Sequence, residues 1–308
     1  MIFFIHRGEI KPYLTAAILQ AAVSDPEESI VVLSDQGPGA VPQALRHLRF
    51  ATIADYSESA DSFAKIFKFD GRNPKSYTLG NFQRWFLIEE FCVLNAITGP
   101  ILHLDSDSYL FLSTAKISAG MKFGMSVCDE IGPQFTLFQQ LDDLTLYTNY
   151  LHKQFFTDAG FVELQEFVAA RKDFGLPHVS DMAAIGLFGA THQVDDLGKP
   201  DRSDFVFDEN IGQPQGLRMG WLGKKIVRHG RNRFFVRPDG SRVLVGGVHL
   251  QGGNKASWPW FVSLDVHIGM AKSNPQEYGK SLVVSAEKLI QVLSVRLGSF
   301  VRRFLKAQ

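Results

Sequence analysis

The chain has 308 residues, of which 45% are hydrophobic and 21% are charged, and its 32 basic residues are balanced by 32 acidic ones. This composition excludes an intrinsically disordered, collagen-like or coiled-coil protein and predicts a globular chain with a large core. The net charge of zero argues against a dedicated binder of duplex nucleic acid, because such proteins carry a basic excess.

Targeting signals and cysteines are sparse in this sequence. The N-terminal segment has a charge at Arg7 and no apolar run of signal-peptide length, and no stretch approaches the roughly 20 apolar residues of a membrane span. Cys92 and Cys128 are too few for a disulfide framework or a four-ligand zinc site. Cys92 stands in an apolar helical run, which predicts a small buried side chain. We expect a cytoplasmic protein.

The first half of the chain alternates predicted strands and helices. Strands are expected at 2–5, 29–33, 51–54 and 100–104, and helices at 12–23, 41–49 and 81–95. Because strands and helices alternate in this way in βαβ units, the order predicts an α/β fold with a mostly parallel sheet covered by helices.

The second half predicts helices at 136–156 and 161–171, and then a hairpin whose strands, 233–236 and 242–245, flank Pro238-Asp239-Gly240. Residues 281–306 predict a long amphipathic helix with a basic end. We therefore divide the chain into a domain over 1–280 and a C-terminal helix over 281–308. This helix packs on the domain or lies on the inner face of a membrane, and both alternatives are open.

Two carboxylates follow the apolar strand expected at 100–104. Asp105 and Asp107 are separated by Ser106 and stand at the carboxyl end of this strand, where open α/β sheets bind ligands. Mg²⁺ and Mn²⁺ prefer oxygen ligands, often carboxylates together with substrate phosphates. The segment predicts a divalent metal site, with a solvated turn as the alternative.

A second polar segment, His249-Leu250-Gln251-Gly252-Gly253-Asn254-Lys255, follows the predicted hairpin. A neutral imidazole is a good ligand for metals of the Mn²⁺ type. Glycine lets the backbone approach a phosphate, and Lys255 can add a positive charge to it. The segment is typical of a phosphate and metal site, although a surface loop is its ordinary alternative.

Together, LHLDSD and HLQGGNK resemble the motifs of GT-A-fold glycosyltransferases, in particular the retaining family 8 and its relatives. The resemblance implies a GT-A catalytic domain over 1–280. It also implies the metal-dependent transfer of a sugar from a nucleotide-diphosphate donor, such as a UDP- or GDP-sugar. The acceptor would be a glycan, a lipid-linked sugar or a protein.

The resemblance implies roles for single residues as well. Asp105, Asp107 and His249 would hold Mn²⁺ or Mg²⁺, with Asp105 also contacting the donor. Gly252 and Lys255 would bind the diphosphate of the donor.

Five further residues are candidates for the same site. Arg84 matches a basic position of the family on the preceding helix and would contact the donor. Asp181 would bind the sugar hydroxyls or the acceptor and is the candidate catalytic residue, with a helix cap beside Ser180 as the structural alternative. His6 and Arg7 follow the first predicted strand, where such a fold receives its nucleotide. Asp55 follows the third and would meet the base or ribose, with ordinary turns as the alternative for both places.

Three other functions remain as alternatives. A sugar-nucleotide pyrophosphorylase would show a glycine- and lysine-rich loop after its first strand, which HRGEIKPY matches poorly. A phosphatase with an Asp-x-Asp nucleophile would carry this pair after its first strand, whereas Asp105 comes late in the chain. A nucleotide-sugar binding protein without catalysis is disfavoured by the complete set of Asp105, Asp107 and His249.

Overall fold

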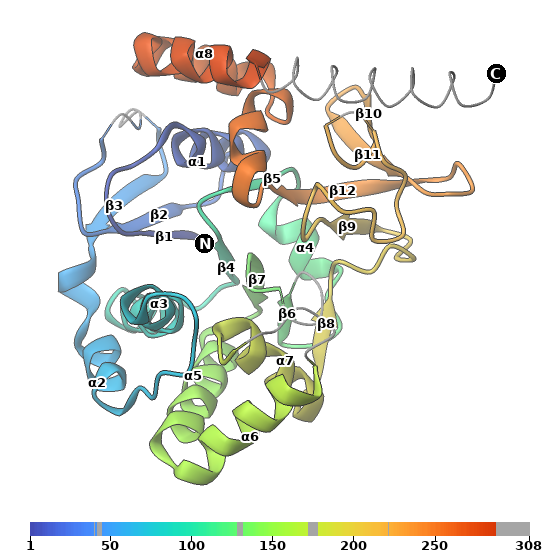
Figure 1. Cartoon of the computed structure of the whole chain (residues 1–308). Coiled ribbons are helices and arrows are strands. Elements are labelled where there is room, and N and C mark those ends of the chain that lie inside the picture. Colours follow the sequence, from blue (N-terminus) through green and yellow to red (C-terminus); the bar gives the residue numbers. More distant parts are fainter. Residues whose placement is uncertain (40, 42–44, 128–131, 172–177, 221, 288–308) are drawn as a thin grey trace.

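The structure, a computed structural model, describes all residues except 40, 42–44, 128–131, 172–177, 221 and 288–308. Within the described residues, the central element is a seven-stranded sheet with the order β3-β2-β1-β4-β7-β6-β8 (Figure 1). Strands β3, β2, β1 and β4 run parallel, as do β6 and β8, whereas β7 is antiparallel to both of its neighbours. The strands are β1 (Ile2–His6), β2 (Ile30–Ser34), β3 (Leu48–Thr52), β4 (Ile101–Leu104), β6 (Met125–Val127), β7 (Phe135–Phe138) and β8 (Val194–Asp196).

Helices cover both faces of this sheet. Because side chains alternate along a strand, Ile2 and Phe4 of β1 pack into one core and Phe3 packs into the other. The first core holds residues of α1 (Pro12–Ser24), α4 (Thr114–Ala119) and α8 (Leu264–Ser273). The second holds residues of η1 (Ile53–Tyr56), α2 (Glu58–Ile66), α3 (Lys75–Leu94), α5 (Leu141–Phe156), α6 (Asp158–Ala170) and α7 (Asp181–Thr191). The predicted α/β fold with a mostly parallel, helix-covered sheet is confirmed.

A second sheet has the order β10-β11-β12-β5, and β9 pairs with β12 in addition. It shares the first core with α1, as Phe235, Val243 and Val245 show. The 3₁₀ helix η3 (Gly252–Trp260) follows this sheet. The strands are β5 (Ser108–Leu110), β9 (Phe205–Phe207), β10 (Ile226–His229), β11 (Asn232–Val236) and β12 (Arg242–His249). The predicted hairpin is confirmed as β11 and β12.

Three sequence predictions were wrong in part. The helix expected at 136–156 begins only at Leu141, because Phe135–Phe138 is strand β7 between β4 and β6. A short apolar run does not distinguish a buried strand from a helix, and here sheet pairing decides. The helix expected at 41–49 falls partly outside the described residues, and its end belongs to β3. Strand β3 runs from Leu48 to Thr52, so it begins and ends earlier in the chain than the strand expected at 51–54. It is a half-exposed edge strand, and it therefore lacks the continuous apolar run by which a buried strand is recognised in a sequence.

The C-terminal region is described only in part. Residues 275–287 are helical, which agrees with the start of the helix predicted over 281–306, and the rest of that prediction lies outside the described residues. Among the residues that the structure describes, no helix is both long and apolar enough to span a membrane. Cys92 is buried as predicted, and this burial raises the pKa of its thiol to about 12.

Candidate metal and donor site

The two aspartates lie where the chain passes from the first sheet to the second. Asp105 follows β4, and Asp107 precedes β5. The backbone N–H of Ser108 donates to the carbonyl oxygen of Asp105 over 2.9 Å, which closes a turn around Ser106. The N–H of Asp105 donates to the carbonyl oxygen of Gln134 over 3.1 Å, which ties the turn to the segment before β7. The sequence DSDS therefore forms a fixed corner that holds both carboxylates at the edge of the sheet.

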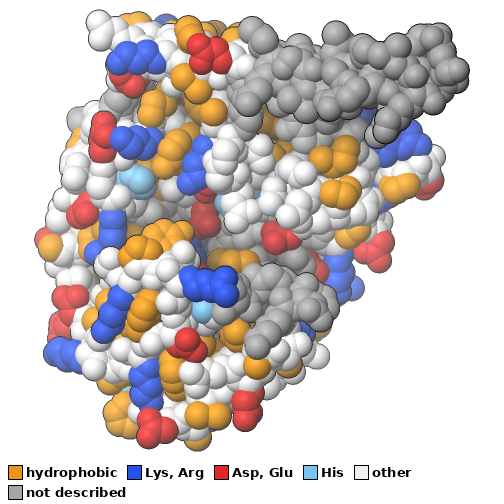
Figure 2. Space-filling model, in the orientation of Figure 1, with side chains coloured by type: hydrophobic (Ala, Val, Ile, Leu, Met, Phe, Trp, Pro, Cys, Tyr) orange, Lys and Arg blue, Asp and Glu red, His pale blue; other side chains and the backbone are white. Residues whose placement is uncertain are grey.

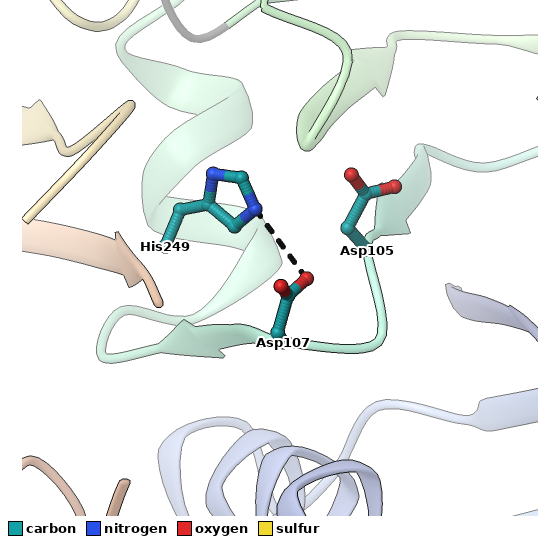
Figure 3. A group of neighbouring side chains, drawn as sticks. All are labelled: Asp105, Asp107 and His249. Atoms are coloured by element: carbon teal, nitrogen blue, oxygen red, sulfur yellow. Dashed lines mark ion pairs between the residues drawn. The ribbon is translucent and has the colours of Figure 1, made fainter. Parts of the chain in front are cut away.

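His249 reaches this corner through strand pairing. It is the last residue of β12 and lies opposite Ser108 of β5 in the antiparallel register. Its Nε2 lies 3.4 Å from Oδ1 of Asp107. In Figure 3 the ring and this carboxylate point toward one another, and Asp105 lies across the same gap. Two motifs far apart in the sequence thus meet because β5 and β12 are neighbours.

The ring of His249 is oriented by the chain at 208–209. Its Nδ1 lies 2.7 Å from the carbonyl oxygen of Glu209, which can only accept, so Nδ1 carries the hydrogen and Nε2 faces the carboxylates. Ligand atoms of Asp105, Asp107 and His249 all lie within 4.8 Å of one another. Two carboxylates and an imidazole whose second nitrogen is already bonded fit a divalent ion such as Mn²⁺ or Mg²⁺.

The backbone of His249 is bonded to a buried ion pair, Asp208 with Lys224, which the sequence did not predict. Asp208 is 1% exposed, and one of its carboxylate oxygens bonds to the ammonium of Lys224, which is 4% exposed. Its other oxygen accepts from the backbone N–H of His249 over 3.3 Å. Burial raises the pKa of Asp208, against the opposing effect of Lys224. The local sequence shows only that the polar residue Asp208 follows the apolar run at 205–207. It does not predict the ion pair, because Lys224 comes from another segment of the chain.

Arg84 holds two of the predicted site residues together. This side chain projects from α3, is buried, and bonds to Oδ1 of Asp105 over 2.5 Å and to the carboxylate of Asp181. Burial opposes the charge of Arg84, but the two carboxylates raise the pKa of the guanidinium above its ordinary value. Arg84 therefore orients carboxylates in this structure, a contact that the sequence did not predict.

Asp181 is the first residue of α7 and is 3% exposed. The helix cap is Ser180, whose side chain accepts from the N–H of Ala183 over 3.3 Å. Ser180 therefore caps the helix, and the carboxylate of the adjacent Asp181 is left to line the cavity.

Lys255 and Gly252 approach from η3. The Lys255 ammonium lies 3.1 Å from Oδ2 of Asp107 and 5.0 Å from the ring centroid of Tyr13. Burial opposes its charge, but Asp107 raises the pKa of Lys255. Gly252 has a φ of 57°, a left-handed conformation that favours glycine. Asp107 is thus shared by two cations, Lys255 and His249.

These residues line one cavity of about 590 Å³, within the usual range of small-ligand sites. Its lining includes His6, Arg7, Arg84, Asp105, Asp107, Asp181, His249, Gly252 and Lys255. Figure 2 shows a hollow near the middle of the molecule where acidic and basic side chains meet. Asp55 does not line this cavity and is exposed on η1. The structure thus brings together all the predicted site residues except Asp55.

Charges inside the cavity are strongly coupled. Burial pushes the pKa of Asp105 upward, but Arg84, His103 and His249 together hold it below its ordinary value. Burial pushes the pKa of His249 downward, but the hydrogen bond to Asp107 and the charges of Asp107 and Asp105 raise it to about 9. The two carboxylates therefore stabilise a positive charge at Nε2 of His249, and they would stabilise a divalent ion at this place in the same way.

No family model and no curated protein matches this sequence. Solved structures with a similar backbone include that of mouse xyloside xylosyltransferase 1. It has 10% sequence identity over 68% of this chain and 86% of that chain, with a TM-score of 0.44. The galactosyltransferase LgtC, in complex with donor and acceptor sugar analogues, has 17% identity over 91% and 95% of the two chains and a TM-score of 0.43. The bifunctional glycosyltransferase WbbM has 10% identity over 91% of this chain and 51% of its own, with a TM-score of 0.47. All three are glycosyltransferases by name.

Proposed function

We propose that this chain is a metal-dependent glycosyltransferase that moves a sugar from a nucleotide-diphosphate donor to an acceptor. The observation that carries the proposal is the convergence of Asp105, Asp107 and His249 in one cavity with Lys255 and Gly252. Carboxylates, an imidazole, a lysine and a glycine backbone are together what a metal-bound diphosphate requires. The donor is a UDP- or GDP-sugar, and the acceptor is a glycan, a lipid-linked sugar or a protein.

Asp105, Asp107 and His249 would hold Mn²⁺ or Mg²⁺. When bound, such an ion supplies Lewis-acid stabilisation of the negative charge that grows on the leaving diphosphate. Asp107 is at present shared by His249 and Lys255, over 3.4 and 3.1 Å. With Asp107 holding such an ion, the Lys255 ammonium would contact the diphosphate of the donor.

Arg84 and Asp181 line the same cavity as Lys255. Arg84 bonds to both Asp105 and Asp181, so it fixes the distance between the metal corner and the start of α7. Asp181 then presents its carboxylate to the sugar hydroxyls or the acceptor. Arg84 would act on the donor mainly through these carboxylates.

The nucleotide would lie toward the carboxyl end of β1. His6 and Arg7 line the cavity there, with His6 Nε2 2.9 Å from the carbonyl oxygen of Glu9 and an Arg7 guanidinium nitrogen donating to Oε1 of Gln83 over 3.0 Å. Asp55 would reach the base or ribose only from outside the described cavity. We therefore rank Asp55 behind His6 and Arg7 as a nucleotide contact.

Retention of the anomeric configuration is part of the proposal and is motivated by the His-x-x-Gly-x-x-Lys pattern at 249–255. NMR of the anomeric proton of the first product tests it directly. An α-linked donor should give an α-linked product, and a β-linked product would refute retention without touching the metal site.

The experiment that tests the function is a screen of UDP- and GDP-sugars with Mn²⁺, Mg²⁺ or chelator, followed by transfer assays with glycan, lipid-linked and protein acceptors. Metal-dependent release of nucleoside diphosphate with transfer to an acceptor supports the proposal. Release of a nucleoside triphosphate from donor and pyrophosphate would indicate a pyrophosphorylase. Tight donor binding without any turnover would indicate a binding protein.

The domain over 1–280 is proposed as the catalytic unit, acting in the cytoplasm, and the helix over 281–308 as a peripheral contact with the inner face of a membrane. Co-sedimentation with anionic vesicles, for the full chain and for a chain truncated before residue 282, tests the second point. Loss of vesicle binding on truncation, with the donor site intact, supports a membrane role. Unfolding on truncation without vesicle binding by the full chain supports packing on the domain.

A further inference from the structure

A second cavity of about 440 Å³ lies beside the hairpin of β10 and β11. Its lining includes the apolar residues Met219, Leu222, Ile226, Trp260 and Phe261 and the basic residues Lys224, Lys225, Arg228 and Arg233. None of the described residues that line it is acidic. We call this cavity the hairpin pocket. It combines a concentrated positive charge with apolar surface.

Arg233 is the most buried arginine in the lining of the hairpin pocket. It is only 8% exposed, and within the described part of the chain its buried Nε has no hydrogen-bond partner. Its guanidinium carbon lies 4.1 Å from the ring centroid of Phe111, which covers one face of the cation. Burial, together with the nearby charge of Arg228, lowers its pKa to about 10. A buried cation without an anionic partner is costly, so the native fold maintains it against a free-energy penalty.

Arg228 increases this penalty. It lies directly opposite Arg233 in the antiparallel pairing of β10 and β11, and like charges in directly opposed positions destabilise a sheet. One guanidinium nitrogen of Arg228 donates to the carbonyl oxygens of Trp260 and Val262, over 3.2 and 3.4 Å, which holds the side chain at the pocket. Among described residues, no carboxylate forms an ion pair with either arginine.

Two lysines have different positions in this arrangement. Lys224 is already neutralised, because its ammonium bonds to Asp208. Lys225 is exposed and adds a third positive charge at the edge of the pocket. Two guanidinium groups and one ammonium therefore face a cavity without a compensating negative charge among the described residues.

A phosphate group matches this charge pattern better than a carboxylate. It carries up to two negative charges and offers several oxygens to the planar forks of two arginines. Met219 and Trp260, which are 40% and 43% exposed, offer apolar surface next to the cations. We propose that the hairpin pocket is a second binding site, which takes a phosphate-bearing amphiphile with its phosphate between Arg228 and Arg233 and its apolar group against Met219 and Trp260.

The hairpin pocket is separate from the donor cavity. Helix η3 begins at Gly252, which lines the donor cavity, and ends at Trp260, which lines the hairpin pocket. The two cavities have no lining residue in common. The two sites can therefore be filled at the same time, and binding at the hairpin pocket does not depend on the proposed transfer activity.

Calorimetric titration of the full chain in chelator, with hexyl phosphate and with inorganic phosphate as probes, tests the proposal. We expect one molecule of hexyl phosphate to bind at the hairpin pocket, at least about tenfold more tightly than inorganic phosphate, because the alkyl chain buries apolar surface. Arg233→Met should weaken this binding by about tenfold or more, as loss of a charge-assisted hydrogen bond does. Arg242→Met, an exposed arginine at the start of β12, and Lys255→Met in the donor cavity should leave it within about twofold.

Thermal unfolding guards against a variant that fails to fold. Since Arg233→Met removes a buried unpaired charge, it should fold at least as stably as the natural chain, and hexyl phosphate should raise the Tm of the natural chain only. Unchanged binding in Arg233→Met, binding lost in Lys255→Met, or no gain from the alkyl chain would each overturn the proposal.

Phosphatidylcholine vesicles with and without phosphatidic acid distinguish the source of the phosphate. Sedimentation with the acidic vesicles that is lost in Arg233→Met identifies a membrane lipid as the ligand. Hexyl phosphate binding without vesicle binding identifies a soluble phosphate ester.

Discussion

The donor cavity and the hairpin pocket both concentrate charge, but they do so in opposite ways. In the donor cavity every charge of the metal corner has a partner: Arg84 holds Asp105, and Lys255 and His249 share Asp107. In the hairpin pocket, Arg228 and Arg233 face each other without a described carboxylate between them. A compensated cluster can exist without its ligand and exchanges partners when the ligand arrives. An uncompensated cluster is destabilising until an anion fills it. The predictions below test this difference.

The largest effect on stability is expected from Arg84→Met. This change leaves the buried carboxylate of Asp181 and the partly exposed carboxylate of Asp105 without their shared cation. Breaking a buried pair such as Arg84 with Asp181 costs about 3–5 kcal/mol. Denaturant unfolding measures the loss. Arg72→Met, at an exposed arginine, is the matched control. A loss below about 1 kcal/mol would mean that the cavity charges are solvated rather than mutually compensated.

Asp107→Asn should lower transferase activity by about 10²–10³-fold, because removing one group that stabilises developing charge commonly costs that much. The variant keeps the size of the side chain at the corner before β5, so we expect its fold to be retained. Initial rates with a saturating donor and Mn²⁺ measure the effect. Activity within tenfold of the natural chain would remove Asp107 from the metal site.

Variants of the buried pair Asp208 and Lys224 test whether this pair positions His249 or only stabilises the fold. Replacing both charges, in Asp208→Leu with Lys224→Met, should keep stability close to that of the natural chain, since apolar replacements of buried pairs are often neutral. Affinity for Mn²⁺ should fall by about 10–100-fold, because the backbone of His249 loses its acceptor.

Calorimetric Mn²⁺ titration and denaturant unfolding of the same samples distinguish the two effects. The control is Asp204→Asn, which breaks the surface ion pair with Arg202 and should change both quantities little. Unchanged metal affinity in the double variant would show that the pair only supports the fold.

How far the sequence could predict this molecule depends on the range of the interactions. The apolar runs at 2–5 and 100–104 predicted β1 and β4 because strands buried on both faces have a local signature. Asp105, Asp107 and His249 were found because each stands in a short motif. The pairs Arg84 with Asp181 and Asp208 with Lys224 were missed, since nothing local to either residue specifies a partner that folding brings from another segment. Strand β7 was missed for the same reason, because its pairing with β4 and β6 decides its structure.

A smaller and graded effect is expected from His103, which lies on β4 beside the metal corner. Burial, and then the charge of Arg84, lowers the pKa of this histidine from 6.5 to about 3. Below about pH 6.5, His103 is protonated in the unfolded chain but stays neutral in the folded chain until the pH approaches 3. The free energy of unfolding therefore decreases as the pH falls from 6.5 toward 3. The loss is about 1.4 kcal/mol per pH unit for one such group.

His103→Asn removes this titration while an amide nitrogen can replace Nδ1, which lies 3.2 Å from the carbonyl oxygen of Pro133. The difference in unfolding free energy between the variant and the natural chain should therefore shift in favour of the variant as the pH falls from 6 to 4. His152→Asn, at an exposed histidine, should show no such trend. A pH-independent difference for His103→Asn would contradict the assignment.

The most direct test of the metal-dependent donor site is calorimetric titration with UDP and GDP in Mn²⁺ and in chelator, for the natural chain and for Asp107→Asn. The arrangement of Asp105, Asp107, His249 and Lys255 predicts that one nucleoside diphosphate binds in Mn²⁺ and that binding is lost both in chelator and in the variant. Equal affinity with and without the metal, or full affinity in Asp107→Asn, would contradict a metal-bound diphosphate at this corner.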